Sequence, residues 1–495
     1  MISSWIRIGA LTLISIITFQ NALGLEPEWI SIYPRLGGDW AQDVAVAQDG
    51  GYIVAGTTGM SFIGNWAAMY VKFAANGDTL WSKTYGCPDP DEQACSDAIL
   101  SLDGGGFISA GSMVPEEFYL GREFWLIRLD ENGDTLWTRH YGAPGWAFDA
   151  ASDICISDDG GYLLVGVQHI LGTENFDIYA VKTDSLGSYE WGKRYGGCCP
   201  SQEERAAACD TTSDGGFLIT GYTSHGPYGH LDLVLMKVNS SGDSLWVTMF
   251  GGGGNDEGHS VRETSDGGSI TAGVLGQWDE CAYLIKTDSY GNPEWEATYL
   301  CDFGARARDV IEVADGYIIT GGVGSPHTAE EDIFVLKVNH SGEILSQWIS
   351  YWPNNDFGIA LKPTDDGGFV VACQVGYGFD DDYGVVKFGP DSTIDAIDDK
   401  NLPDSHGMLN VFPNPFNSYA RIEFSLAKTS QVKLDVYAID GRTVRTLLSQ
   451  SMEPGYHSII WDGTNEDGMP VSSGLYFCTM VSGDNTLTSR MVLLK

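Results

Sequence analysis

Two short phrases recur along this chain at nearly constant spacing, and this repetition constrains the fold more than any other feature. A phrase of the type DGGYIVAG occurs seven times, about 49 to 56 residues apart, beginning at positions 49, 103, 159, 214, 266, 314 and 366. A second phrase, of the type NGDTLWSKTYG, also occurs seven times if a degenerate first copy is counted, with its tryptophan at Trp29, Trp81, Trp137, Trp191, Trp246, Trp295 and Trp348. A fixed period of this length predicts a repeat architecture.

Each period predicts four short strands. In the second period, apolar residues alternate over 97–102, 106–112, 124–130 and 134–142, which is the pattern of half-buried strands. The DGG and NGD segments between them supply glycines that tolerate the positive φ of tight hairpin turns. Seven four-stranded antiparallel sheets of about 50 residues indicate an all-β chain with a seven-bladed β-propeller over residues 25–389.

The two phrases are out of phase at the ends of the repeat region. The first tryptophan phrase precedes the first DGG phrase, and the last DGG phrase is followed by no tryptophan phrase. We therefore expect the strand around Trp29 to become the outer strand of the last blade. Pairing the two ends would close the ring and remove both exposed sheet edges.

The regions outside the repeats have different characters. Residues 1–24 combine Arg7, an apolar run and the small residues Ala22 and Gly24, as in a cleavable secretory signal. No later stretch is long and apolar enough to span a membrane. Residues 390–403 read as an acidic linker, and residues 404–495 alternate strand and turn patterns that predict a small β-sandwich.

The C-terminal region resembles the sorting domains of cargo of the bacterial type IX (Por) secretion system. The resemblance is carried by VYAIDGRTVRTL (436–447), WDGTNEDGMPVSSGLYF (461–477), the terminal MVLLK and a motif made of Pro413, Asn414, Pro415, Phe416 and Asn417. It implies an immunoglobulin-like fold similar to that of flagellar hook-capping proteins. It also implies passage through the periplasm, the type IX machinery as a partner, and a final location outside the cell or on its surface.

The phrase LDENGDTLW is similar to the repeat of quinoprotein dehydrogenases and their non-enzymatic propeller relatives. The resemblance implies that each tryptophan packs one blade on the next. Cys198 and Cys199 are similar to the vicinal disulfide over the quinone in some of those enzymes. The count of seven blades rather than eight weighs against a quinone cofactor, and we expect no cofactor.

The net charge is −40, nearly all of it in residues 25–403. Such a surface repels phosphate backbones, so nucleic acids and anionic membranes are poor partners. The charge is typical of a soluble exported protein.

The ten cysteines of an exported chain can form disulfides. Cys87 and Cys95 bracket one short loop. Cys209 lies near both Cys198 and Cys199, and the sequence leaves open which of these it joins. Cys281 and Cys301 are equally far from Gly291 in a predicted hairpin, so they could face each other across it.

Loops that differ from blade to blade are the expected place for ligand binding, because the DGG and NGD turns are short and alike. Aromatic residues in these variable loops would serve as platforms for sugar rings or as anchors for a protein. They include Phe118, Tyr119, Phe148 and Phe379, and the leading candidates are Trp66, Trp146, Tyr228, Trp278, Trp352 and Tyr377. The alternative is that several of them simply pack their own loops.

Four aspartates, Asp43, Asp97, Asp153 and Asp309, lie six residues before the Asp of their blade's DGG or DGY phrase. At the start of the innermost strands they would ring one mouth of the central channel, where calcium suits carboxylate oxygens. The alternative, which the residues favour, is that each caps its own turn. We expect no other metal site.

No catalytic motif is present: the chain has no G-x-S-x-G, no H-E-x-x-H and no P-loop. His225, His230 and His259 are interpreted as polar loop residues. We expect a surface or extracellular module that binds a glycan or a protein and lean against an enzyme. A secreted polysaccharide hydrolase with carboxylates on the long loops, and a structural or adhesive surface protein, are the alternatives.

Overall fold

The computed structural model divides into two compact units, residues 1–394 and 395–495. The division falls inside the stretch expected to be a linker. The structure describes residues 6–8, 25, 27–33, 38–390 and 407–493, except for gaps at 61–64, 87–93, 115–120, 143–147, 170–174, 197–202, 277–279, 302–303, 325–329, 351–354, 378–379, 413–419, 427, 429, 440, 453–454, 462, 467–468 and 483–484. No helix in this part of the chain is long and apolar enough to cross a membrane.

The first unit is built from four-stranded antiparallel sheets in which sequential strands are neighbours. The first two sheets contain β3 (Asp39–Val46), β4 (Tyr52–Met60), β5 (Asn65–Phe73) and β6 (Thr79–Tyr85), then β7 (Ala94–Ser101), β8 (Phe107–Met113), β9 (Glu123–Leu129) and β10 (Thr135–Tyr141). The next two contain β11 (Asp149–Ile156), β12 (Tyr162–His169), β13 (Phe176–Thr183) and β14 (Tyr189–Tyr195), then β15 (Glu204–Thr211), β16 (Phe217–Thr223), β17 (Asp232–Val238) and β18 (Ser244–Phe250). Two more contain β19 (Glu257–Glu263), β20 (Ser269–Leu275), β21 (Cys281–Thr287) and β22 (Pro293–Tyr299), then β23 (Ala305–Val313), β24 (Gly316–Gly324), β25 (Glu331–Val338) and β26 (Ile344–Ile349).

The last sheet joins the two ends of the repeat region. It contains β27 (Asp356–Pro363), β28 (Phe369–Tyr377) and β29 (Asp380–Phe388), and its outer strand is β2 (Pro27–Tyr33). β2 runs antiparallel to β29, with Trp29 opposite Lys387. A short β1 (Ile6–Ile8), within the expected signal segment, pairs in parallel with β2. The strand around Trp29 therefore closes the last sheet, as the phase of the phrases predicted.

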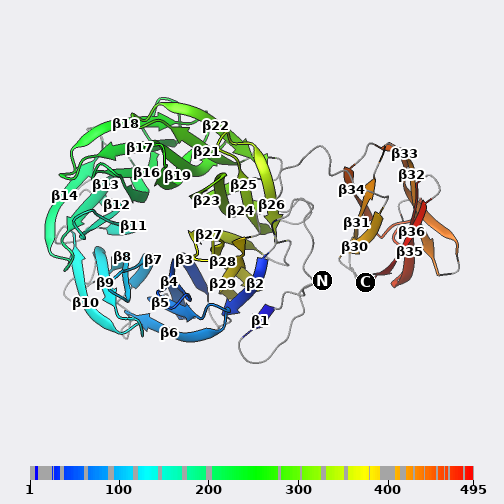
Figure 1. Cartoon of the computed structure of the whole chain (residues 1–495), viewed down its shortest axis with the longest axis horizontal. Coiled ribbons are helices and arrows are strands. Elements are labelled where there is room, and N and C mark those ends of the chain that lie inside the picture. Colours follow the sequence, from blue (N-terminus) through cyan, green and yellow to red (C-terminus); the bar gives the residue numbers. More distant parts are fainter. Residues whose placement is uncertain are drawn as a thin grey trace. The chain divides into compact units, whose positions relative to one another are not determined.

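Figure 1 shows these sheets side by side around a ring, as in a β-propeller. The 28 strands β2–β29 fit seven four-stranded blades, which we number 1 to 7 from β3 onward. The core lies between neighbouring blades. For example, Ile53 and Tyr70 of blade 1 pack with Phe107 and Ile127 of blade 2 in one buried cluster. Each blade is therefore stabilised by its neighbours rather than by a core of its own.

The tryptophan phrase is a contact between successive blades. Trp81 of blade 1 lies against Gly133, in the NGD turn of blade 2, so closely that a Cβ there would lie 2.5 Å from the Trp81 ring. The same Trp-to-Gly contact recurs from Trp29 to Gly77, Trp137 to Gly187, Trp191 to Gly242, Trp246 to Gly291 and Trp295 to Gly342. Glycine is needed at this turn position both for its positive φ, 78° at Gly133, and for the room that it leaves.

Other residues of the phrase reinforce this contact. The Tyr85 hydroxyl donates to the Gly133 carbonyl, and the Lys83 ammonium lies 2.5 Å from the Asp134 carboxylate of the same turn. Tyr299 repeats the tyrosine bond, donating to the Gly342 carbonyl at 2.7 Å. The W-x-K-x-Y residues of one blade therefore contact the N-G-D turn of the next blade, which explains why the two motifs recur together.

The DGG phrases fix buried lysines on the third strands. Lys286 of β21 is only 4% exposed and lies 2.9 Å from the Asp266 carboxylate and 3.0 Å from Glu294. Burial alone would raise the pKa of Asp266, but hydrogen bonds from Thr264 and Lys286 lower it to about 2. Equivalent pairs join Lys72 to Asp49, Lys182 to Asp159, Lys237 to Asp214, Lys337 to Asp315 and Lys387 to Asp366. The DGG turns, at the edge of the propeller opposite the variable loops, therefore have a structural role: they neutralise the buried lysines.

The second unit contains two antiparallel sheets. One contains β30 (Gly407–Phe412), β31 (Ala420–Leu426) and β34 (Gly455–Trp461). The other contains β33 (Thr443–Met452), β32 (Ser430–Ala438), β35 (Gly474–Ser482) and β36 (Asn485–Leu493). Trp461, Phe424, Leu434 and Met480 are buried in one core shared by both sheets, which is the arrangement of a small β-sandwich.

Candidate functional site

The first and third strands of each blade begin at one edge of the propeller, which is where the sequence predicts the variable loops. We call this the loop edge. A cluster of aromatic and cationic side chains lies there across blades 2, 3 and 4: Arg122, Phe148, His169, Phe176 and Arg205.

Aromatic rings form the centre of this cluster. The rings of Phe148 and Phe176 are 6.2 Å apart at 88°, and the His169 ring lies 5.1 Å from Phe176. The Arg122 guanidinium lies 5.3 Å from the Phe148 ring, and that of Arg205 lies 5.1 Å from the Phe176 ring. Phe148 is 37% exposed, so an apolar face flanked by two guanidinium groups is open to solvent.

The backbone explains why these residues gather. Isolated parallel bridges pair Arg122 with Phe148 and Phe176 with Glu203, tying the third strand of one blade to the first strand of the next. Glu203 also holds Arg205, whose Nε lies 2.8 Å from a carboxylate oxygen, and accepts a hydrogen bond from the Tyr222 hydroxyl at 3.2 Å. The cluster is therefore held by strands and not only by loop tips.

An exposed aromatic face beside guanidinium groups suits a ring-shaped ligand that carries negative charge. Carbohydrate rings stack on aromatic faces, and a guanidinium group binds a carboxylate through two parallel hydrogen bonds. Of the cluster, only Phe148 was among the sequence candidates. The other four, Arg122, His169, Phe176 and Arg205, were missed in the sequence because they lie at strand ends and not within the variable loops. Comparing equivalent strand-end positions from one period to the next would have identified them.

The other aromatic candidates that the structure describes lie on separate blades. Trp66 packs against Trp40 of its own blade, with ring centroids 4.5 Å apart. Tyr228 is 50% exposed, and its backbone N–H donates to Asp232. Tyr377 ends β28, but its side chain lies outside the described residues, as do all of Phe118, Tyr119, Trp146, Trp278, Trp352 and Phe379.

Three of the four channel aspartates join neighbouring blades. Asp43 accepts hydrogen bonds from Val44 N–H, next to it, and from Ile99 N–H of blade 2. Asp153 bonds Ile154 N–H and Cys209 N–H of blade 4 in the same way, and Asp309 bonds Val310 N–H and Leu361 N–H of blade 7. The expectation of a cap within one turn is therefore incomplete, because each of these carboxylates also reaches the next blade.

Asp97 does not share this position. The first strand of each blade has a register shift, which falls between Ala41 and Asp43 in β3 and between Ser96 and Ala98 in β7. Ala98, not Asp97, is the counterpart of Asp43. The equal spacing in sequence was misleading because the DGGG turn of blade 2 has one extra glycine. Burial raises the pKa of Asp97 to about 7.

The centre of the channel also holds cationic side chains. Arg262 lies 3.0 Å from a carboxylate oxygen of Asp309, and Lys362 lies 3.3 Å from one of Asp43. Burial lowers the pKa of Lys362, but the nearby carboxylates of Asp43 and Asp309 raise it by more, so the net shift is upward. Burial raises the pKa of Asp153 to about 7 against the opposing charge of Arg262. Arg262 and Lys362 thus provide positive charge beside the aspartates for which a calcium ion was considered.

Among the described residues, no group of three or more His, Cys, Asp or Glu side chains is arranged to hold a metal ion. His259 is not a loop residue: it lies in β19, where its Nδ1 is 2.7 Å from the Ala307 carbonyl oxygen and its Nε2 is 3.5 Å from Glu257. His225 and His230 lie between β16 and β17, as expected.

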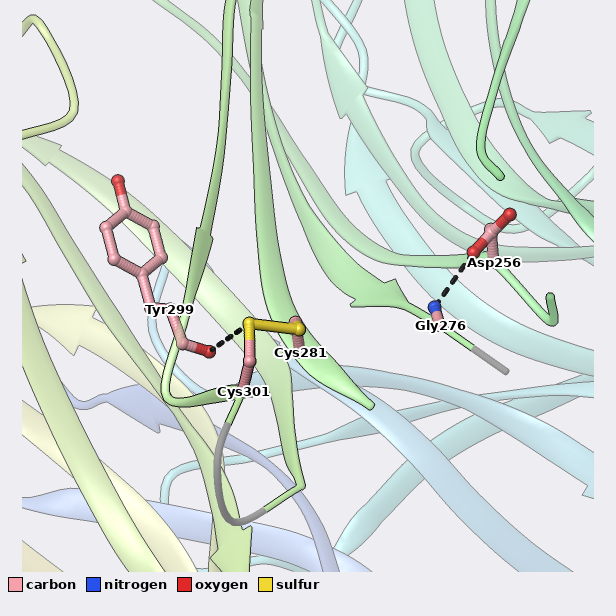
Figure 2. The surroundings of a disulfide bond; sticks show 5 residues. All are labelled: Asp256, Gly276, Cys281, Tyr299 and Cys301. Atoms are coloured by element: carbon pink, nitrogen blue, oxygen red, sulfur yellow. Dashed lines mark hydrogen bonds between the residues drawn. A yellow bond between two sulfur atoms is a disulfide. The ribbon is translucent and has the colours of Figure 1, made fainter. Parts of the chain in front are cut away.

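The cysteines follow the predictions only in part. A disulfide joins Cys281 and Cys301, the pairing that the hairpin symmetry suggested, and Figure 2 shows it at the start of β21. Cys209 is a buried free thiol beside Cys155 of blade 3. Cys95 is also free, and its suggested partner Cys87 lies outside the described residues, as do Cys198 and Cys199.

Comparison with known proteins gives a match to one family model, the FlgD Ig-like domain, over residues 416–485. No curated protein matches. Among solved structures, the type IX secretion surface component PorZ of Porphyromonas gingivalis is 12% identical, with a TM-score of 0.40 over 91% of this chain and 59% of that one. This chain thus spans less than two thirds of PorZ.

Two other solved structures have similar levels of likeness. A protein of unknown function from Dyadobacter fermentans is 13% identical, with a TM-score of 0.43 over 74% of this chain and 99% of that one. A quinone-bound aldose sugar dehydrogenase from Streptomyces coelicolor is 8% identical, with a TM-score of 0.35 over 59% of this chain and 94% of that one.

Proposed function

We propose that this chain is an exported seven-bladed propeller that binds an anionic glycan at its loop edge, and that the C-terminal unit is a type IX sorting domain. The observation that carries the export proposal is the match of residues 416–485 to the FlgD Ig-like domain. It coincides with the motifs that resemble type IX sorting domains, whose fold is similar to that of hook-capping proteins. The type IX machinery is then the partner of this unit.

The export proposal is tested by truncation. A chain ending at residue 403 keeps the whole propeller but lacks the second unit. In a bacterium with a type IX system, the full chain should reach the medium or the outer surface, and the truncated chain should accumulate in the periplasm. Export of the truncated chain at the normal level would contradict the proposal.

The binding proposal rests on the cluster around Phe148 and Phe176. Its exposed ring and the guanidinium groups of Arg122 and Arg205 would contact a sugar ring and its carboxylate together. A ring contact of this kind contributes about 0.5–1.5 kcal/mol, so its removal should weaken binding roughly two- to tenfold.

Calorimetric titration with uronic-acid polysaccharides and their neutral counterparts tests this. Phe148→Ala and Arg205→Ala should each weaken binding of the acidic polymer. Tyr290→Ala is the matched control, because Tyr290 is 76% exposed on a turn at the opposite edge of the propeller. Equal binding by all variants would refute the site. Turnover of a polysaccharide would instead support a hydrolase, and a cell-adhesion defect without glycan binding would support an adhesive protein.

A further inference from the structure

Acidic residues recur in pairs where successive blades meet at the loop edge. One acid lies at or near the start of the third strand of a blade, and the other lies at or next to the start of the first strand of the next blade. We call these the junction pairs: Glu123 with Asp149, Asp177 with Glu204, Asp232 with Asp256, Asp332 with Asp356, and Asp382 with Asp39. Blades 1 and 2 instead place Ala67 and Ala94 at these positions, and blades 5 and 6 place Cys281 and Ala305.

The backbone brings the two acids of a pair together. Leu231 and Asn255 form a parallel bridge, and the Asp256 N–H donates to the Leu231 carbonyl at 2.8 Å. The next residues, Asp232 and Asp256, therefore lie opposite each other, with their side chains on the same side of the bridge. The bridges of Arg122 with Phe148 and of Phe176 with Glu203 precede their acid pairs in the same way.

The pair between blades 4 and 5 is fully buried, since Asp232 and Asp256 are both 0% exposed. Asp256 accepts hydrogen bonds from the N–H groups of Gly252, at 2.5 Å, and Gly276, at 3.0 Å; the latter bond is drawn in Figure 2. One oxygen of Asp232 accepts from Tyr228 N–H at 2.9 Å. The other, Oδ1, is buried and has no partner among the described residues.

The pair between blades 6 and 7 repeats this arrangement. Asp356 is 0% exposed: its Oδ1 accepts from Gly376 N–H at 2.9 Å, and its buried Oδ2 has no partner in the described part of the chain. Asp332 is 4% exposed. Burial, together with the charges of Asp332, Glu330 and Asp381, raises the pKa of Asp356 to about 8.

Two buried carboxylates side by side need a positive charge or a proton between them. At the opposite edge of the propeller the buried charges are balanced by lysines, such as Lys286 with Asp266. At the junctions, the side-chain charge that acts on Asp256 is that of Asp232, another acid. The pairs Asp232–Asp256 and Asp332–Asp356 thus each contain one buried carboxylate oxygen that has no partner among the described residues.

We propose that the junction pairs Asp232–Asp256 and Asp332–Asp356 each bind a calcium ion that bridges neighbouring blades. The donors are carboxylate oxygens without His or Cys, which favours a hard cation. Two carboxylates supply only part of the six to eight oxygens that calcium takes, so backbone carbonyls and water complete the shell. This places the affinity in the range of extracellular calcium modules, about 10⁻⁴–10⁻³ M. These sites are distinct from the channel aspartates.

The junction of blades 5 and 6 supports a bridging role. Cys281 occupies the position of the first acid, and its disulfide to Cys301 ties it to the segment that leads into β23 (Figure 2). At this junction a covalent bond fastens the start of a third strand to the connection that leads to the next blade.

The test uses the purified full chain after removal of metals with a chelator. Calcium is titrated by calorimetry, and thermal unfolding of the propeller is followed in calcium, magnesium or chelator. Calcium at a hundredfold excess over its dissociation constant should raise the folded-to-unfolded ratio about a hundredfold for each occupied site. Magnesium should do less, because it requires a smaller octahedral shell.

Asp232→Asn and Asp356→Asn should each remove one calcium equivalent and part of the calcium-dependent stabilisation. Asp365→Asn is the matched control, because it removes one carboxylate from an exposed turn outside the junctions. If Asp232→Asn does not fold, Asp256→Asn gives the same readout for that site. No calcium-dependent stabilisation of the unaltered chain, or an unchanged response in both junction variants, would overturn the proposal and leave the pairs as carboxyl groups that share a proton.

Discussion

The contact between Trp81 and Gly133 predicts that adding one methyl group at position 133 lowers the stability of the propeller more than the same change at a comparable turn. In Gly133→Ala, the new Cβ would lie 2.5, 2.7 and 3.0 Å from three carbons of the Trp81 ring. Since Trp81 would have to move by about 1 Å to restore normal contact, the change should disrupt the packing of blade 1 on blade 2.

The chain offers a matched control for the backbone part of this effect. Gly160, in the DGG turn of blade 3, has the same φ of 78° as Gly133, but a Cβ there would have nothing within 4 Å. Alanine in the left-handed region costs about 1–2 kcal/mol at either site. Overpacking against Trp81 should add about 1–3 kcal/mol at Gly133 alone.

Urea unfolding of the propeller, followed by circular dichroism, measures both losses. We expect Gly160→Ala to lower the free energy of unfolding by about 1–2 kcal/mol and Gly133→Ala by about 2–5 kcal/mol. In a Trp81→Ala background the two glycine changes should cost the same to within about 0.5 kcal/mol. Equal losses in the unaltered background, or a difference that persists without Trp81, would refute the packing argument.

Two further predictions concern the disulfide and the buried Asp97. Replacing Cys281 and Cys301 by Ser removes a disulfide with a sequence separation of 20 and should lower the free energy of unfolding by up to about 3 kcal/mol. Urea unfolding should give the same midpoint for this variant and for the reduced parent chain. A midpoint equal to that of the oxidised parent chain would contradict the prediction. The pKa of Asp97 is raised from 3.8 to about 7, so ionising it opposes folding increasingly from about pH 4 to pH 7. Asp97→Asn should therefore raise stability most above pH 7, by at most about 4 kcal/mol, and have little effect below pH 4; a gain that does not vary with pH would count against this.

Parts of the loop edge could not be predicted from the sequence because its residues come together only when blades are placed in register. Asp97 appeared equivalent to Asp43 by counting residues, yet the extra glycine at the DGGG turn shifts it by one position. A shift of one residue turns a strand side chain to the other face. Similarly, the distance between Cys155 and Cys209 is set by the packing of two blades and not by their spacing.

The sequence by itself determined the repeat, its period, the four strands of each period and the closure of the ring by the strand around Trp29, because these depend on local patterns and on the order of the two phrases. It also indicated that Trp81 and its counterparts pack blade on blade. Only the tertiary structure decided which residues meet across blades: the cluster around Phe148, the channel network of Arg262 and Lys362, and the buried junction pairs. The contacts between blades join residues more than 20 positions apart, and their geometry depends on register and on the angle between sheets, which no local pattern encodes.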